Sequence, residues 1–243
     1  MSELYYERST CLLCASKKLE MAMPLVATPI GDKYLPLERR DETRETIPLD
    51  LFLCRDCGHL QTGAVMNPVA AYKHYLSRPA AVNPTLADAY RQYAQDIIDH
   101  IKPPEDGLIV ELGSNNGVFI NFFRERGMKV LGVEPAENLA AAATEMGVET
   151  IPDFFTSKLA SQIKAERGSA SVVICNFAYS NMDNLDDITD GISELLTPDG
   201  VFMFETNSRV DIFQKHLLEP ITHEHLSLFS VRPLRDFFPR HGM

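Results

Sequence analysis

The sequence predicts an α/β protein in which a small β module is followed by a parallel sheet with helices on both faces. Strand and helix patterns alternate from residue 108 onward, and the strands are apolar, as in sheets buried on both sides. Within that region Ile109–Phe119, I-V-E-L-G-S-N-N-G-V-F, passes from a strand through a glycine turn into a helix. Before it, two C-x-x-C pairs lie in a proline-rich region without helical periodicity.

The N-terminal module, residues 1–66, is defined by its cysteines. Four of the five cysteines form two C-x-x-C pairs, Cys11 with Cys14 and Cys54 with Cys57. Two such pairs can supply four thiolates to one tetrahedral ion, so we expect a structural zinc with no coordination position open for catalysis. A redox or metal-free role stays open, although a redox C-x-x-C more often stands alone after a strand and opens a helix.

Residues 67–107 are predicted to connect this module to the sheet, and residues 108–243 to form the ligand-binding domain. Pro84–Ile101 has apolar residues at helical spacing and stops before two prolines, which predicts a helix. Further on, glycines at the ends of apolar-periodic segments indicate helix C-termini. The predicted strands are Leu108–Leu112, Val130–Glu134, Thr150–Ile151, Ser171–Asn176 and Gly200–Glu205, and the predicted helices cover residues 117–127, 137–147, 156–167, 185–196 and 231–240.

The glycine turn predicts a nucleoside site at the carboxyl ends of the strands. Gly113 allows a sharp turn after the first strand, and Gly117 lets the helix backbone approach a ligand or the neighbouring strand. The second strand ends in Glu134, 21 positions after Gly113. An acid at about this spacing is where a carboxylate holds a ribose diol.

Two ligands compete for this site. A dinucleotide site has three glycines, G-x-G-x-x-G, so that a pyrophosphate can approach the backbone, whereas this loop has two glycines separated by asparagines. S-adenosylmethionine carries no phosphate and tolerates such a loop, so E-L-G-S-N-N-G, which begins at Glu111, and V-E-P, which ends at Pro135, favour a methyl donor. A nucleotide-dependent oxidoreductase and an ordinary turn without a ligand are the alternatives.

The composition of the chain argues against some classes of binding partner. The formal net charge of −11 argues against non-specific binding to nucleic acid and to an anionic membrane surface. No apolar run approaches the length of a membrane span, and the N-terminus lacks the apolar core of a signal peptide, so we expect a cytoplasmic protein. The composition carries no signal for oligomeric state.

A third motif, T-H-E-H-L-S-L-F-S at Thr222–Ser230, joins the cysteine pairs and the glycine loop. With all three, the chain resembles the zinc-containing, S-adenosylmethionine-dependent sugar C-methyltransferases of deoxysugar biosynthesis along essentially its whole length. The resemblance implies a zinc module before a Rossmann-like class I methyltransferase sheet. The C-terminal domain with which this family helps to hold a nucleotide-linked sugar has no counterpart here, so we expect a truncated chain.

The resemblance also implies a donor site. The glycine loop would lie beside the methionine part of the donor, and Asn176 would line the pocket. Asp153 and Phe154 would flank the adenine, and Glu134 would bind the ribose. The expected donor-site residues belong to these motifs, strand ends and loops: Glu111, Gly113, Asn115, Gly117, Glu134, Pro135, Asp153, Phe154 and Asn176.

On the acceptor side, the resemblance places Glu224 and His225 at the sugar. His225 would be the base that removes a proton α to a ketone, and His223 is a further catalytic candidate. A metal-binding H-x-H pair and loop histidines bonded to backbone or water are the alternatives. The family's tyrosine is replaced here by Thr222, and its histidine by Ser180 or Asn181. The sequence thus predicts a methyltransferase of a small polar metabolite, such as an activated sugar; the alternative is a non-catalytic, donor-binding relative that acts as a partner or scaffold.

Overall fold

The computed structural model describes residues 4–31, 35–73, 75 and 83–243. In this part of the chain, no helix combines the length and the apolar character needed to cross a bilayer.

The chain forms two compact units, and both are assembled from separated segments. Residues 206–243, which the sequence analysis assigned to the ligand-binding domain, pack with the N-terminal module. Unit 1 comprises residues 1–71, 180–185 and 206–243, and unit 2 comprises residues 72–179 and 186–205.

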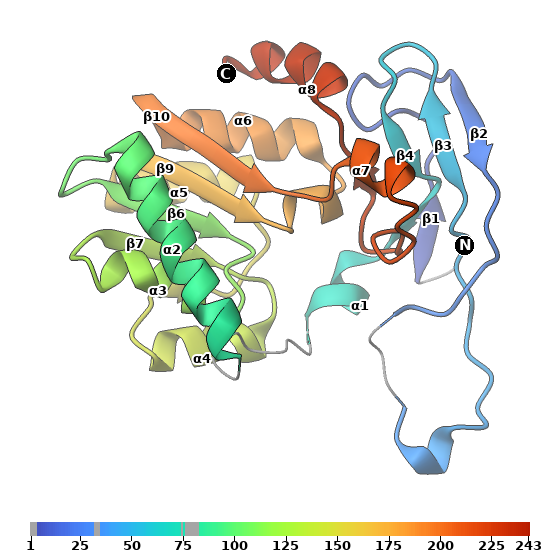
Figure 1. Ribbon diagram of the computed structural model, residues 1–243, viewed down its shortest axis with the longest axis horizontal. Helices are drawn as coiled ribbons and strands as arrows, with labels where there is room; N and C mark the ends of the chain where they lie inside the picture. The colour runs from blue at the N-terminus through green and yellow to red at the C-terminus, as the bar shows by residue number, and fades with distance from the viewer. Residues whose placement is uncertain (1–3, 32–34, 74, 76–82) are drawn as a thin grey trace. The chain divides into compact units, whose positions relative to one another are not determined.

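Unit 2 contains a five-stranded sheet in which every neighbouring pair is parallel, in the order β10-β9-β6-β7-β8. Figure 1 labels the first four of these strands. The chain begins the sheet at β6, continues outward through β7 and β8, and then returns to the other side of β6 with β9. The switch point therefore lies between β6 and β9, where ligands of open α/β sheets bind. The predicted fold class is confirmed. The strands are β6 (Leu108–Leu112), β7 (Lys129–Val133), β8 (Thr150–Ile151), β9 (Ala170–Asn176) and β10 (Leu196–Glu205).

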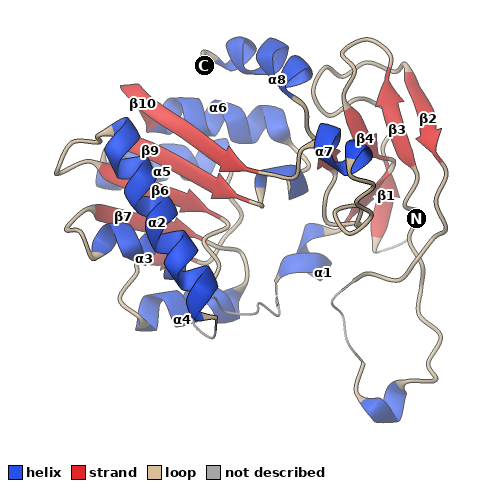
Figure 2. Ribbon diagram, viewed as in Figure 1, coloured by secondary structure: helices blue, strands red, loops and turns tan. Residues whose placement is uncertain are grey.

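Helices cover both faces of this sheet; in Figure 2, α2 lies in front of the strands and α6 behind them. On the α2 face, Ile109 and Ile174 of the strands pack in one apolar cluster with Phe119 and Phe123 of α3 and Ile97 of α2. The helices of this unit are α2 (Pro84–Ile101), α3 (Val118–Arg124), α4 (Glu137–Glu145), α5 (Ser157–Arg167) and α6 (Leu185–Leu195); the 3-10 turn η3 (Tyr179–Asn181) precedes α6.

Local signals explain why α2 begins and ends where the sequence predicts. The Asn83 side chain accepts a hydrogen bond from the backbone N–H of Leu86 (3.2 Å), and Pro84 occupies the first turn, where its missing N–H costs nothing. At the other end Lys102 adopts a left-handed conformation (φ 53°), which stops the helix.

Unit 1 contains an antiparallel sheet of order β11-β4-β3-β2 and a separate antiparallel pair, β1 with β5. Leu51 and Leu60 of this sheet form an apolar cluster with Ile212 and Leu228 of the C-terminal segment. Its elements are β1 (Tyr5–Glu7), β2 (Leu19–Met23), η1 (Leu37–Arg39), β3 (Leu51–Cys54), β4 (Leu60–Thr62), β5 (Ala64–Met66), α1 (Pro68–Tyr72), α7 (Arg209–Gln214), β11 (Ser227–Leu228), α8 (Val231–Phe237) and η4 (Phe238–His241).

Candidate functional site

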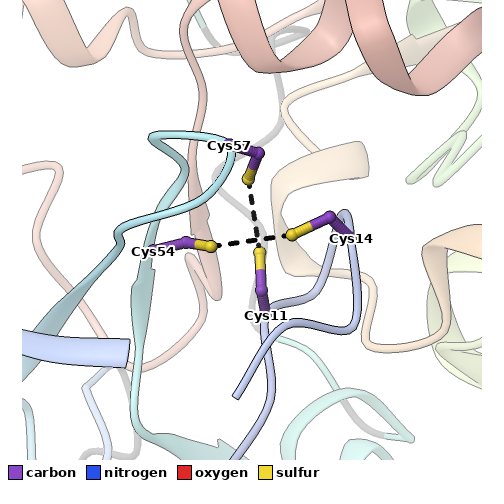
Figure 3. A group of neighbouring side chains, drawn as sticks. All are labelled: Cys11, Cys14, Cys54 and Cys57. Atoms are coloured by element: carbon purple, nitrogen blue, oxygen red, sulfur yellow. Dashed lines mark hydrogen bonds between the residues drawn. The ribbon is translucent and has the colours of Figure 1, made fainter. Parts of the chain in front are cut away.

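The four paired cysteines converge in unit 1 (Figure 3). All four sulfur atoms lie within 4.8 Å of one another, and the Sγ–Sγ distances are 3.6 Å for Cys11–Cys57 and for Cys14–Cys54. Four sulfurs about 2.3 Å from a tetrahedral zinc are separated by about 3.8 Å, so this cluster has the size of a zinc–tetrathiolate site. The predicted zinc ligands are therefore brought together.

Tight backbone turns hold each pair. In the first, the N–H of Cys11 donates to the carbonyl of Ser16 (2.9 Å); in the second, the N–H of Cys54 donates to the carbonyl of His59 (2.8 Å). Gly58 has a positive φ of 79°, a conformation that L side chains adopt only with strain. This lets the chain turn directly after Cys57 and return as β4.

Two arginines of the C-terminal segment support these turns. The guanidinium of Arg209 donates to the carbonyl of Gly58, and that of Arg240 donates to the carbonyl of Leu13. Burial lowers the pKa of Arg209, while the nearby Cys57 thiolate acts in the opposite direction. Four thiolates around one Zn²⁺ leave two net negative charges, so the partly buried guanidinium of Arg209 near Cys57 offsets part of that charge. The sequence analysis missed both arginines, because no local pattern marks a contact between segments so far apart.

In unit 2, the glycine loop joins β6 to α3. Gly113 and Gly117 have positive φ values of 70° and 75°. A Cβ on Gly113 would lie 2.6 Å from the Cβ of Ala178, and a Cβ on Gly117 would lie 2.9 Å from the Cβ of Ala143 in α4. Close packing between backbone segments therefore requires both glycines, and Gly117 serves the contact between α3 and α4.

The Glu134 carboxylate anchors this loop. One of its oxygens accepts a hydrogen bond from the backbone N–H of Asn115 and the other from that of Ala136, both at 2.8 Å. Burial raises the pKa of Glu134, and these two N–H groups partly offset the effect. A carboxylate has about four lone-pair positions, so two acceptor positions are left for the ribose hydroxyls that the sequence analysis expects.

Two expected donor-site side chains hold buried polar atoms that lack a partner among the described residues: Oε2 of Glu111 and Oδ1 of Asn176. A backbone N–H bond from Ile120, in the first turn of α3, holds Glu111 in place. Burial, and then the negative charge of Glu134, raise the pKa of Glu111 well above its usual value. An unsatisfied buried acceptor costs about 1–3 kcal/mol, and the α-ammonium group of S-adenosylmethionine supplies the kind of donor that would satisfy these two.

The remaining expected donor residues follow the ends of β7 and β8. Pro135 sits directly after Glu134, and Asp153 is exposed with its carboxylate accepting from the N–H of Phe154 (2.7 Å). Phe154 is partly buried. Their roles at the ribose and adenine stay predictions.

The acceptor candidates lie in unit 1, before β11. His223 is 4% exposed, and its Nε2 donates to the carbonyl of Ile47 (3.0 Å), while burial lowers its pKa and favours the neutral ring. His225 is partly exposed, and its Nδ1 donates to the carbonyl of Pro220 (2.6 Å). Because a carbonyl only accepts, the neutral His225 ring carries its proton on Nδ1 and keeps Nε2 as its basic nitrogen.

Both histidines therefore bond a backbone carbonyl, as the alternative of a loop histidine bonded to backbone expects; they differ in that His223 is buried and His225 is partly exposed. Glu224, between them, is partly exposed. The catalytic roles of all three stay predictions.

Comparisons with known families divide the chain at the same motifs. A family described as a zinc binding domain matches residues 11–72, which include all four clustered cysteines. A family described as a methyltransferase domain matches residues 86–243, more than half of the chain.

Individual proteins and solved structures are also similar to this chain. The C-methyltransferase NovU of Streptomyces niveus is 30% identical over 244 residues, and the match covers 100% of this chain but 58% of NovU. A candidate O-methyltransferase of Nostoc punctiforme has a similar fold (TM-score 0.50, 12% identity, 67% of this chain and 52% of that chain). A methyltransferase of Thermotoga maritima, described as S-adenosylmethionine-dependent, matches with a TM-score of 0.46 and 17% identity over 68% of this chain and 77% of its own.

Proposed function

The chain belongs to the S-adenosylmethionine-dependent methyltransferase family, and we propose that it methylates a small polar acceptor, an activated sugar, with His225 as the base. It spans only 58% of NovU, so the activity of the whole protein is part of this proposal.

The observation that carries the donor side is the set of acceptor atoms at the switch point. Glu134 offers free lone pairs beside the glycine loop, and Glu111 and Asn176 present buried oxygens without partners among the described residues. These groups match a ligand with a ribose diol and an ammonium group, and no phosphate. Bound S-adenosylmethionine would supply an electrophilic methyl group on a sulfonium sulfur.

On the acceptor side, the chain contributes a base with a defined tautomer. Nε2 of His225 would take a proton from the carbon next to a ketone of the acceptor, leaving that carbon as the nucleophile. The hydrogen bond from Nδ1 to Pro220 keeps the ring oriented and stabilises the positive charge that the ring gains. Small-molecule methyl transfer needs little beyond this removal of a proton and the alignment of two reactants.

The test separates proton removal from methyl transfer. Zinc-loaded protein is incubated in D₂O with S-adenosylhomocysteine and a nucleotide-linked keto sugar, and mass spectrometry follows deuterium uptake next to the ketone. We expect His225→Gln to slow uptake by about 100-fold or more, the usual contribution of a general base. His100→Gln, which changes an exposed histidine of α2, is the control.

Uptake that His225→Gln leaves unchanged would refute the role of His225. Methylation is then followed with S-adenosylmethionine in place of S-adenosylhomocysteine. Donor binding without turnover of any keto sugar would instead favour a non-catalytic relative. Thr222 and the buried Ser180 are consistent with that alternative, because they replace acceptor-site residues of the family.

A further inference from the structure

Three polar side chains end three neighbouring strands on one face of the sheet in unit 2. Glu205 of β10 pairs in register with Asn176 of β9, and Glu111 of β6 pairs with Ile174, two residues earlier on β9. Side chains alternate between faces along a strand, so residues two apart share a face. Glu111, Asn176 and Glu205 therefore point to the same side.

That side is the one covered by α2 and α3. Ile109, Ile174 and Met203, each two residues before one of the three polar residues, all pack in the apolar cluster under these helices. The polar side chains thus form the outer rim of this cluster, at the carboxyl ends of the strands where ligands bind.

Two tyrosines of α2 face the same rim. Tyr90 and Tyr93 both border the apolar cluster and pack against Phe119. The distance from the Phe119 ring centroid is 5.5 Å to the Tyr90 ring and 5.3 Å to the Tyr93 ring. Burial raises the pKa of both phenols, and the negative charges of Glu205 and Glu111 raise it further. Both tyrosines therefore lie close enough to the two carboxylates to be affected by their charge.

Within the described part of the chain, no ion pair involves any of the three rim side chains. Glu111 is 4% exposed. Its Oε2 and the Oδ1 of Asn176 are buried and have no hydrogen-bond partner among the described residues. Burial also raises the pKa of Glu205. Carboxylates and unsatisfied acceptors on one face of the sheet, at the edge of an apolar cluster, favour a positively charged ligand with several N–H donors.

We propose that Glu205 completes, with Glu111 and Asn176, a three-acceptor site for the α-ammonium group of the methyl donor. An ammonium group has three N–H donors, and the ends of three adjacent strands offer three acceptor groups. Tyr90 and Tyr93 wall the site and limit its access to water, which strengthens charge-assisted hydrogen bonds. This inference rests on the proposed function, because it assigns the part of the donor that the site would hold.

Three ligands that differ in positive charge distinguish binding of the ammonium group from binding of the sulfonium group. S-adenosylmethionine carries an ammonium and a sulfonium, S-adenosylhomocysteine carries only the ammonium, and 5′-methylthioadenosine carries neither. Calorimetry with full-length, zinc-loaded protein compares the wild type with Glu205→Gln for each ligand. The control is Glu166→Gln, which removes an exposed charge on α5.

We expect Glu205→Gln to weaken S-adenosylmethionine and S-adenosylhomocysteine alike, by about 10-fold or more, as for a lost charge-assisted hydrogen bond. Binding of 5′-methylthioadenosine should stay within about twofold of the wild type, which also shows that the variant is folded. The control should match the wild type for all three ligands.

Three results would overturn the inference. Unchanged binding of S-adenosylhomocysteine would show that Glu205 is not at the ammonium group. A loss confined to S-adenosylmethionine would place Glu205 at the sulfonium, and an equal loss for 5′-methylthioadenosine would show a general effect on the fold. A wild type that binds none of the three ligands would refute the proposed function as well, whereas the other results leave that function intact.

Discussion

Gly117→Ala tests whether the second glycine of the loop serves packing. The new methyl group would lie 2.9 Å from the Cβ of Ala143 and 3.3 Å from that of Val148. Neither neighbour can rotate away, because both atoms are attached directly to the backbone. The left-handed conformation (φ 75°) costs an L residue about 1–2 kcal/mol, and overpacking adds about 1–3 kcal/mol. The expected loss in the free energy of unfolding is thus about 2–5 kcal/mol.

Gly127→Ala is the matched control. Gly127 also has a positive φ, 82°, but a Cβ there would meet no atom within 4 Å, so only the conformational cost of about 1–2 kcal/mol applies. Equilibrium unfolding in urea, followed by circular dichroism, measures both variants. If Gly117→Ala is no more destabilising than Gly127→Ala, the packing explanation is refuted.

Three further predictions follow from the two sites. Cys54→Ser should abolish stoichiometric zinc, measured by metal analysis, whereas Cys175→Ala, outside the cluster, should keep it. Arg209→Gln should speed the transfer of zinc to a chromogenic chelator, because it removes positive charge beside the thiolates; Arg235→Gln, at an exposed arginine, should not. Glu111 has a raised pKa, so its contribution to stability is fully present below its unfolded pKa of about 4 and is lost as pH rises through the folded value. Glu111→Gln should therefore stabilise the ligand-free protein more at pH 7 than at pH 5, in urea unfolding, and a pH-independent difference would contradict this.

Local signals made much of the fold predictable. Asn83 and Pro84 mark the start of α2, and the bounds of β6 follow from an apolar run that ends at Gly113. The spacing of the cysteine pairs predicted the zinc cluster, because a C-x-x-C turn brings two thiolates to one side whatever lies between the pairs.

Contacts between distant segments could not be predicted in this way. The pairing of β11 with β4 involves only Ser227 and Leu228, too few residues for a strand pattern, yet it places the acceptor motif in unit 1. Glu205 likewise ends an ordinary strand, and only the register with Asn176 shows its place beside the other acceptors. At Gly117 the residue was predicted correctly but its role was ambiguous. A ligand-binding loop and a close contact between helices both require glycine, and only the structure shows the contact with Ala143.

The central claim, that the carboxyl ends of β6 and β7 form a donor site, is tested most directly by calorimetry. Zinc-loaded wild type and Glu134→Ala are titrated with S-adenosylhomocysteine, and urea unfolding verifies that the variant is folded. We predict one bound ligand per chain for the wild type and a loss of at least about 10-fold in affinity for the variant, which lacks the carboxylate that is expected to bind the ribose. Binding that the folded variant retains in full, or no binding by the wild type, would contradict this account.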